Sequence, residues 1–355
     1  MSASKLANEP GHLLGSPADL TTSVGWKAFC EAEERRAAAL PSDDSANVPR
    51  GAGAGGETPE PGLRLPVLRT DQLEKVRSQA ELLRQLNTKP SPGARPGLVI
   101  DGEASTGKTT AALAAGRWWQ AKSQAQSDDR PARNEFVPVV YVTLPASATS
   151  RSISASIVSF YGIEPGSRAN KDRLTRVAKE LATGCGTSLI IVDDIHYLDA
   201  SRHDGTLSNN HLNYLANLLP VTFIYAGIGV ESHPLLSESG KLTFSQTASR
   251  FSLVRMCPYQ DPDSEEWLAL VLGFEKALGI ASTPNGRPSR SLMEYLFDRS
   301  GGKIGSLAFL LRAAAYVAGA EGARRVTKKH FEAVTIDYAA ETSFARRQRR
   351  RTSAA

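Results

Sequence analysis

One eight-residue segment restricts the possible folds of this chain more than any other feature of its sequence. Gly102-Glu103-Ala104-Ser105-Thr106-Gly107-Lys108-Thr109 matches the pattern GxxxxGK[ST] in full. It lies between residues 97–101, which predict a short apolar strand, and residues 111–121, which predict a helix. A P-loop requires this context, because its glycines let backbone N–H groups surround phosphates at a helix N-terminus. The alternative, a chance glycine-rich turn, would not require a strand before it and a helix after it. The sequence therefore predicts a P-loop that binds ATP or GTP.

The residues of this loop have separate expected roles. We expect Lys108 to reach the β- and γ-phosphates and the hydroxyl of Thr109 to ligate Mg²⁺. Later in the chain, Lys303 follows a glycine pair at an expected helix start and can approach the phosphates, although such a start needs no ligand to explain it. The predicted cofactors are ATP and Mg²⁺, and the predicted cofactor-binding residues are Gly102, Glu103, Ala104, Ser105, Thr106, Gly107, Lys108, Thr109, Thr110 and Lys303.

A second apolar segment ends in two acids, Asp193 and Asp194. An apolar strand that ends in an acid is the Walker B arrangement, so we predict that Asp193 holds the metal through water. Asp194 is a predicted catalytic residue, because hydrolytic ATPases of this kind usually have Glu there to orient the attacking water. Aspartate is one methylene shorter, so we expect slow hydrolysis. The alternative is a pair of acids in a solvated turn, and the nearby His196 is more often a packing residue than a base.

Segments that predict strands alternate with helical segments as far as Pro258. The strands are expected at 97–101, 137–143, 188–192, 221–225 and 252–256. This alternation is typical of a parallel sheet covered by helices on both faces. After Pro258 only helical patterns remain, at 263–278, 289–298, 304–318 and 328–340. We therefore predict an α/β P-loop domain followed by a smaller, all-helical unit.

The N-terminal region differs in composition from this body. Residues 41–62 contain five Gly and four Pro, so burial cannot offset the entropy of ordering them. Before them, the charged, Ala-rich residues 31–40 predict a short helix, and Trp26 and Phe29, three residues apart, can dock on the main body or on a partner. The predicted organisation is a flexible segment and linker at 1–64, a nucleotide-binding domain at 65–258, a helical lid at 259–341 and a basic disordered tail at 342–355.

Basic charge gathers at the C-terminal end. The net charge is +5, and residues 324–355 hold nine Lys and Arg against three acids, or +6, which leaves −1 for the rest. This distribution indicates a local anionic partner. Residues 346–351 would neutralise the phosphates of duplex DNA without reading its sequence, and the alternative is a solvated tail. No aromatic residue is interleaved among these arginines, which argues against base stacking.

Cysteine usage and hydropathy indicate the compartment. The three cysteines lie far apart without a CxxC pair, which argues against a disulfide framework or a zinc module and fits a reducing environment. We find no signal peptide pattern and no apolar run of about 18 residues, so we expect a cytoplasmic protein with no membrane partner.

Arg250 is the second predicted catalytic residue. It stands immediately before the last expected strand. In ring-forming ATPases an arginine at this place reaches the nucleotide of a neighbouring subunit and neutralises charge. The alternative is an ordinary surface arginine.

Together these residues resemble the AAA+ superfamily and, within it, the TniB/TnsC-like ATPases of bacterial transposons. The resemblance runs from about residue 65 to 340 and is carried by the P-loop, the segments at 189–198, 249–251 and 300–318, and the Gly-Trp pair of the N-terminal region. It implies a homo-oligomer, a ring or filament, that assembles on duplex DNA with ATP and links a target-selector protein to a DDE transposase. It also implies that Arg250 acts in trans. Two departures, Asp194 for Glu and Gly305 where many AAA+ lids carry an arginine, put the turnover rate in doubt.

We therefore expect an ATPase that regulates DNA transposition. Two other classes stay open at this point. One is a nucleotide-dependent signalling or defence switch that binds a protein partner, although no long effector domain is visible. The other is a helicase loader or remodelling ATPase, whose turnover its target protein would stimulate.

Overall fold

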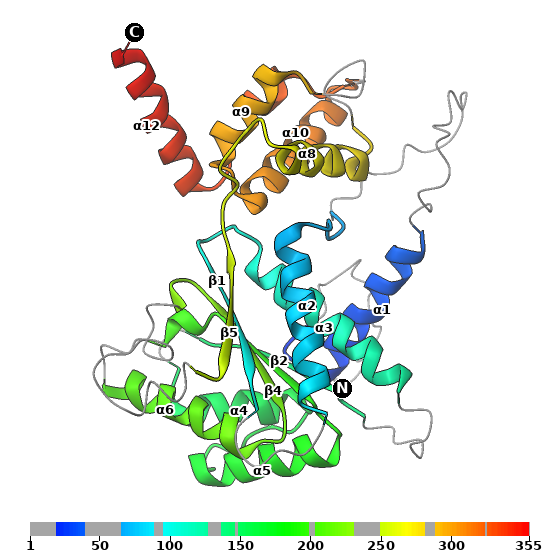
Figure 1. Cartoon of the computed structure of the whole chain (residues 1–355), viewed down its shortest axis with the longest axis vertical. Coiled ribbons are helices and arrows are strands. Elements are labelled where there is room, and N and C mark those ends of the chain that lie inside the picture. The colour runs from blue at the N-terminus through cyan, green and yellow to red at the C-terminus, as the bar shows by residue number, and fades with distance from the viewer. Residues whose placement is uncertain are drawn as a thin grey trace, which may run out of the picture.

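A parallel five-stranded sheet organises the larger part of the molecule (Figure 1). Its strands are β1 (Gly97–Gly102), β2 (Val139–Thr143), β3 (Leu189–Asp193), β4 (Thr222–Gly227) and β5 (Phe251–Met256), in the spatial order β2-β3-β4-β1-β5. All five residues of β3 and all six of β4 are buried, as expected for strands that helices cover on both faces. The predicted parallel sheet is confirmed, and each predicted strand is present.

The computed structural model describes most of the chain. The described residues are 19–39, 65–88, 95–126, 136–145, 148–198, 203–230, 249–280, 288–323 and 325–354. The glycine- and proline-rich segment 41–62, predicted to be a linker, lies outside them.

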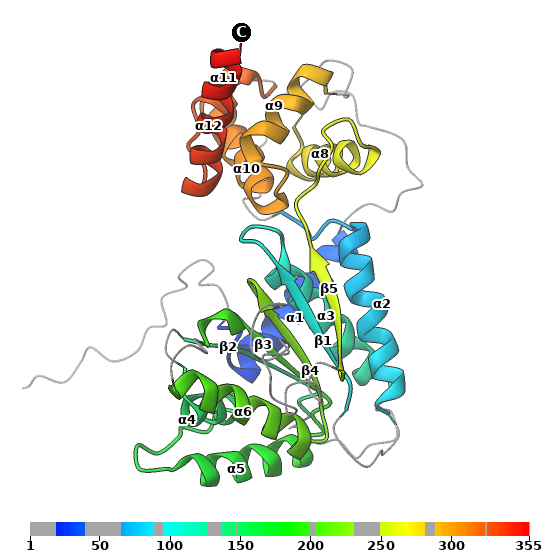
Figure 2. The same cartoon turned by 60° about the vertical axis from the view of Figure 1, so that its left-hand side comes forward.

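Helices cover both faces of the sheet (Figures 1 and 2). One face carries α1 (Ser23–Ala39), α2 (Asp71–Leu86) and α3 (Lys108–Ala125), and the other carries α4 (Ser150–Phe160), α5 (Lys171–Gly184) and α6 (His203–Leu218). Polar residues begin several of these helices: the side chains of Thr70, Thr149 and Asn170 each accept a backbone N–H of the first turn. Because all five strands run parallel, the carboxyl ends of β1 and β3 lie at the same edge of the sheet.

Helix α1 begins eight residues before the short helix expected at 31–40, so residues 1–64 are more than a flexible segment and linker. Trp26 of α1 is only 2% exposed and belongs to the core of the sheet domain, as does Cys30. Glu33 pairs with Arg117 of α3 at 3.0 Å. Trp26 and Cys30 belong to this core and the partly buried Phe29 packs against it, so docking on the main body is the alternative that holds.

A second hydrophobic cluster lies in a helical unit above the carboxyl edge of the sheet (Figure 2). Its helices are α8 (Glu265–Leu278), α9 (Arg290–Ser300), α10 (Ile304–Ala320), α11 (Lys328–Glu332) and α12 (Tyr338–Ala354). Trp267 and Phe331 are fully buried in it, and Ser264 and Ser289 cap α8 and α9. Within the described residues no single helix meets the length and hydropathy of a membrane span; α9 and α10, which turn by 116° between them, meet both only as a pair.

The C-terminal end differs from the prediction in two ways. The helix expected at 328–340 is two helices, because Asp337 begins α12 by accepting the backbone N–H of Ala340 and also accepts the hydroxyl of Ser306. The tail expected to be disordered from residue 342 is helical to Ala354. Phe344 packs edge-on against Tyr295, with ring centroids 6.1 Å apart, and so fixes α12 to the helical unit.

Candidate nucleotide-binding site

The glycine-rich loop has the backbone geometry that its sequence predicts. β1 ends at Gly102 and α3 begins at Lys108, so the loop joins a buried strand directly to a helix N-terminus. A Cβ at position 102 would lie 2.2 Å from the carbonyl oxygen of Met256 on β5, so only glycine fits there. Gly107 has φ 93°, a left-handed conformation that glycine adopts without strain, and no side chain caps α3. The first amides of α3 are therefore oriented to receive an anion.

Lys108 is a buried cation at the start of this helix. Its side chain lies inside the loop, where Nζ donates to the carbonyl oxygen of Glu103 at 2.6 Å. Burial lowers the pKa of this amine, and the nearby carboxylates of Asp193, Asp101 and Asp194 act in the opposite direction. The ammonium group of Lys108 and the backbone amides that begin α3 suit phosphate oxygens, and the nearby carboxylates suit a divalent metal. Lys108, Asp193 and Asp194, predicted from separate segments, are thus brought together.

Asp193 ends β3 and is 2% exposed. Both of its carboxylate oxygens accept a hydrogen bond: Oδ1 from the backbone N–H of Asp194 at 2.9 Å, and Oδ2 from the hydroxyl of Tyr141 at 3.0 Å. Tyr141 lies on β2, two residues before Thr143, which pairs with Asp193 in the sheet. The orientation of the carboxylate is therefore fixed by its neighbours, as a metal-binding acid requires.

Asp194 adopts a backbone conformation that few side chains tolerate. Its φ of 57° and ψ of 36° lie in the left-handed region, where Asp and Asn are the common non-glycine residues. Burial raises the pKa of its carboxyl group, and the charge of Asp193 raises it further. The strained backbone gives a physical reason for aspartate at this position. The effect of the shorter side chain on hydrolysis stays a prediction.

The helical unit touches the loop directly. The backbone N–H of Gly305, in the first turn of α10, donates to the carbonyl oxygen of Ser105 at 2.8 Å. The amine of Lys303 pairs with the carboxylate of Glu103 at 2.7 Å. A Cβ at position 305 would lie 2.9 Å from the oxygen of Ser105, so this arrangement leaves no room for the arginine found in other lids. Lys303 therefore lies at the loop with Glu103 as its partner, and its approach to the phosphates stays a prediction.

Arg250 is the one predicted site residue that the structure leaves far from this cluster. It precedes β5, and its guanidinium donates to Asn217 at 2.7 Å. β5 pairs with β1 from Phe251 to Met256, so Arg250 lies at the amino edge of the sheet and the P-loop at the carboxyl edge. Six strand residues at about 3.3 Å each separate the two edges by roughly 20 Å. Arg250 therefore belongs to a different surface from the P-loop of its own chain.

Sequence reasoning did not single out two polar residues of the site. Asp101, buried at the end of β1, accepts the backbone N–H groups of Gly102 at 2.8 Å and Val230 at 3.0 Å. An acid at the end of an apolar strand was a visible signal for it. Tyr141 carries no such signal, because a tyrosine inside a β strand is ordinary. His196 has a buried Nδ1 that no described residue bonds, and its ring lies 4.4 Å from that of Tyr197.

The chain is similar to one family model and to several solved structures. Residues 67–261 match the family model described as bacterial TniB protein. The structure of Aeropyrum pernix Orc1 in complex with DNA is similar at 16% identity and a TM-score of 0.54, over 78% of this chain and 65% of that one. Pyrobaculum aerophilum Cdc6p gives 15% identity, a TM-score of 0.48 and coverage of 73% and 65%, and Thermotoga maritima RuvB gives 14%, 0.43, 73% and 66%.

The chain spans just under two thirds of the length of the Orc1 structure. Among curated proteins, none matches this chain in sequence. At such low identity the likeness to Orc1 establishes the fold, and the predicted AAA+ P-loop architecture is confirmed.

Proposed function

The chain belongs to the bacterial TniB family, and from this premise we propose that it is a DNA-associated AAA+ ATPase that regulates transposition. The observation that carries the proposal is the convergence of Lys108, Asp193 and Asp194 under a helix N-terminus, with the lid helix α10 in contact with the same loop. ATP is the proposed substrate and Mg²⁺ the proposed metal. The transposase and the target-selector protein are proposed partners on the strength of the family.

The residues at the site divide the chemistry among them. Backbone amides of the loop and Lys108 would bind the phosphates. The hydroxyl of Thr109, and Asp193 through water, would hold Mg²⁺, which supplies positive charge against the phosphate oxygens when it is bound. Asp194 orients a water molecule and accepts its proton at the carboxylate.

The position of Arg250 supports assembly into a homo-oligomer. Its guanidinium lies at the amino edge of the sheet, so it cannot serve the P-loop of its own chain without a large rearrangement. We propose that it completes the site of a neighbouring copy. The contacts of Lys303 and Gly305 with the loop would let the lid, and with it the interface between copies, respond to bound nucleotide.

The proposed DNA contact lies on α12. Three arginines of this helix, Arg346, Arg349 and Arg350, are exposed at a spacing of three and four residues, which places them on neighbouring parts of one helical face. Arg347 instead donates to the carbonyl oxygen of Asp298 and holds the helix in place. A rigid helix bearing exposed arginines suits a phosphate backbone, and it replaces the disordered tail in the proposal.

The proposal is tested by measuring binding to duplex DNA with ATP, with ADP and without nucleotide. We expect tight binding and oligomers with ATP, and the loss of this difference in Lys108→Ala. Equal, weak binding in all three conditions would contradict the proposal. Oligomers that form with ATP but need no DNA would favour a switch that binds a protein partner, and ATP turnover stimulated by a helicase would favour a loader.

A paired set of variants tests the contribution of α12. Replacing its three exposed arginines (Arg346, Arg349 and Arg350) by alanine should reduce the salt dependence of DNA binding, by about 0.9 in log–log slope for each phosphate that the helix no longer neutralises. The control replaces three exposed arginines of the sheet domain, Arg168 just before α5 and Arg173 and Arg176 within it, and should leave the slope unchanged. Equal effects of the two sets would remove α12 from the DNA interface.

A further inference from the structure

Helix α1 reaches the metal-binding edge of the sheet through two aromatic side chains. The indole of Trp26 stacks on the ring of Tyr141, with centroids 6.0 Å apart and planes inclined by 15°. The hydroxyl of Tyr141 in turn donates to Oδ2 of Asp193 at 3.0 Å. All three side chains are at most 3% exposed, so the chain of contacts runs through the core of the sheet domain.

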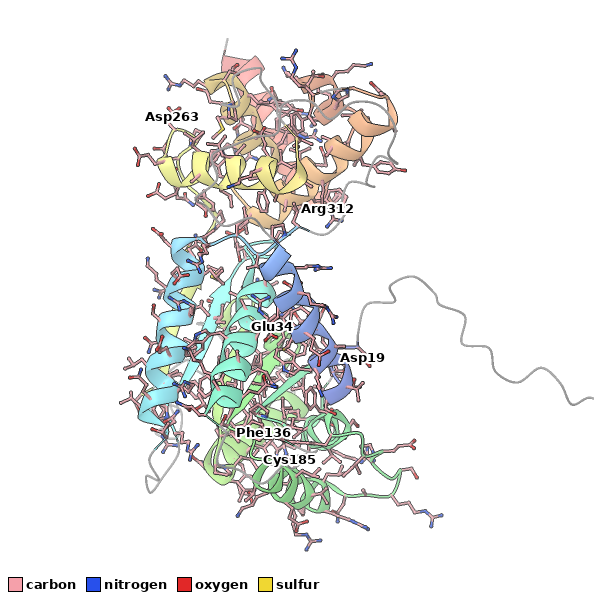
Figure 3. The ribbon with its side chains drawn as sticks, turned by 90° about the vertical axis from the view of Figure 1, so that its right-hand side faces the viewer. Asp19, Glu34, Phe136, Cys185, Asp263 and Arg312 are labelled. Carbon is pink, nitrogen blue, oxygen red and sulfur yellow. The ribbon has the colours of Figure 1, made fainter. Side chains whose placement is uncertain are left out.

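The seat of Trp26 is shaped by a glycine of α3. A Cβ at Gly116 would lie 2.8 Å from the indole and 2.6 Å from Cδ1 of Ile191, the residue that pairs with Tyr141 in the sheet. Trp26 also donates its indole N–H to Gln120 at 3.4 Å. In Figure 3, α1 lies next to α3, and Glu34 is labelled on α1. Gly116 therefore leaves the space that the indole of Trp26 fills, and the indole packs on strands β2 and β3, the second of which ends at Asp193.

The hydroxyl of Tyr141 is more than a packing group. Phenylalanine would fill the same volume, and a buried hydroxyl must find a hydrogen-bond partner. Here the partner is the carboxylate that is proposed to bind the metal. A carboxylate oxygen accepts hydrogen bonds, so the hydroxyl of Tyr141 is the donor in this pair. The second oxygen of Asp193 is bound by the backbone, so Tyr141 is the side chain that fixes the rotation of the carboxylate.

Helix α1 is attached through a narrow face. Gly25, Trp26 and Cys30 are its buried residues among those whose side chains are described, while Val24 is 78% exposed. An element that buries so few apolar groups is among the first to open locally. Its departure would remove the ring that covers Tyr141 without removing any residue of the P-loop.

We propose that Tyr141 is a positioning residue for Asp193 and that α1, through Trp26, holds Tyr141 in place, so that seating of α1 sets the affinity of the site for Mg²⁺. The inference rests on the proposed function, in which Asp193 is the metal-binding acid. It gives the N-terminal region a regulatory role: a partner that draws α1 away weakens metal binding at a distance.

The test measures Mg²⁺-dependent binding of a fluorescent ATP analogue to the full chain, together with its thermal unfolding. Tyr141→Phe should raise the Mg²⁺ concentration at the midpoint by roughly tenfold, the effect expected when an outer hydrogen bond to a metal ligand is removed. Binding of the analogue in EDTA should not change. Trp26→Ala should shift the midpoint in the same direction, and Trp26→Phe, which retains an aromatic ring, should shift it less.

The matched control is Tyr161→Phe. Its hydroxyl is also bonded within the domain, to Thr187 at 2.7 Å, but Thr187 precedes β3 and so lies at the opposite end of that strand from Asp193. An unchanged midpoint in Tyr141→Phe, or an equal shift in Tyr161→Phe, would overturn the role of Tyr141. A shift in Tyr141→Phe with none in Trp26→Ala would overturn the role of α1. If the unaltered chain bound the analogue without any Mg²⁺ dependence, the proposed function itself would fail.

Discussion

The contact between the lid and the P-loop predicts an unusual response to a small substitution. Glycine inside a helix is less stable than alanine by up to about 1 kcal/mol, so Gly→Ala normally stabilises. Gly305 of α10 should behave in the opposite way. A methyl group there would lie 2.9 Å from the carbonyl oxygen and 3.2 Å from the Cα of Ser105, and both are backbone atoms that cannot move aside alone.

The size of the effect follows from two unfavourable changes. Overpacking against a fixed backbone costs about 1–3 kcal/mol. Separation of the helix from the loop also breaks the hydrogen bond from Gly305 to Ser105, worth about 0.5–1.5 kcal/mol. Even after the gain in helix propensity, the contact should weaken by roughly 2 kcal/mol, a factor of about 30 in the ratio of closed to open lid.

Hydrogen exchange of the backbone amides in the first turn of α10 measures this ratio. We expect faster exchange there in Gly305→Ala, with little change in the strands of the sheet. The matched control is Gly319→Ala, in the same helix, where a Cβ would meet no atom within 4 Å. That variant should stabilise the helical unit. Exchange in Gly305→Ala as slow as in the unaltered chain, or a gain in stability equal to that of Gly319→Ala, would refute the steric argument.

Three further predictions concern the site and the core. Asp194→Glu should raise ATP turnover several-fold without changing nucleotide affinity, and should lower the stability of the fold, because glutamate tolerates the left-handed backbone less well than aspartate. No gain in turnover by a folded variant would show that the aspartate already positions the water. Arg250→Ala should lower turnover in concentrated protein while an isolated subunit binds nucleotide normally, and an unchanged rate would remove Arg250 from the chemistry. Burial lowers the pKa of His211, which is bonded to Ser154 at 2.8 Å, to about 4, and nearby Lys171 acts in the same direction. Because the folded chain favours neutral imidazole, its stability should fall as pH drops from about 6.5 towards 4, and His211→Gln should flatten the unfolding free energy across that window.

The parts of the fold that sequence could predict are those set by local pattern. The P-loop, the apolar strands and the helical unit all follow from spacing of a few residues, and the structure confirms them. The carboxylate of Asp193 was expected for the same reason. Such patterns specify which residues end a strand, and the rule that parallel strands share a carboxyl edge then brings those residues together.

The parts that sequence missed depend on contacts between distant segments. Tyr141 became part of the site only because β2 lies beside β3. The arginines of α12 favoured a prediction of disorder. The contact that orders this helix, Phe344 against Tyr295, involves a residue of another helix, α9. The left-handed backbone of Asp194 likewise has no local sequence signal beyond the tolerance of aspartate for it. In each case tertiary packing decided what composition could not.

The placement of Arg250 at the amino edge of the sheet and of Lys108 at the carboxyl edge gives any assembly built on the proposed contact a direction. If each copy supplies its arginine to the next, the copies stack head to tail, and the two ends of an open filament are chemically different. One end presents an arginine with no site to complete, and the other presents a nucleotide site with no arginine. An open filament of n copies then has n − 1 complete sites and a closed ring has n. The terminal copy whose nucleotide site receives no arginine from a neighbour is the one that would keep its nucleotide longest.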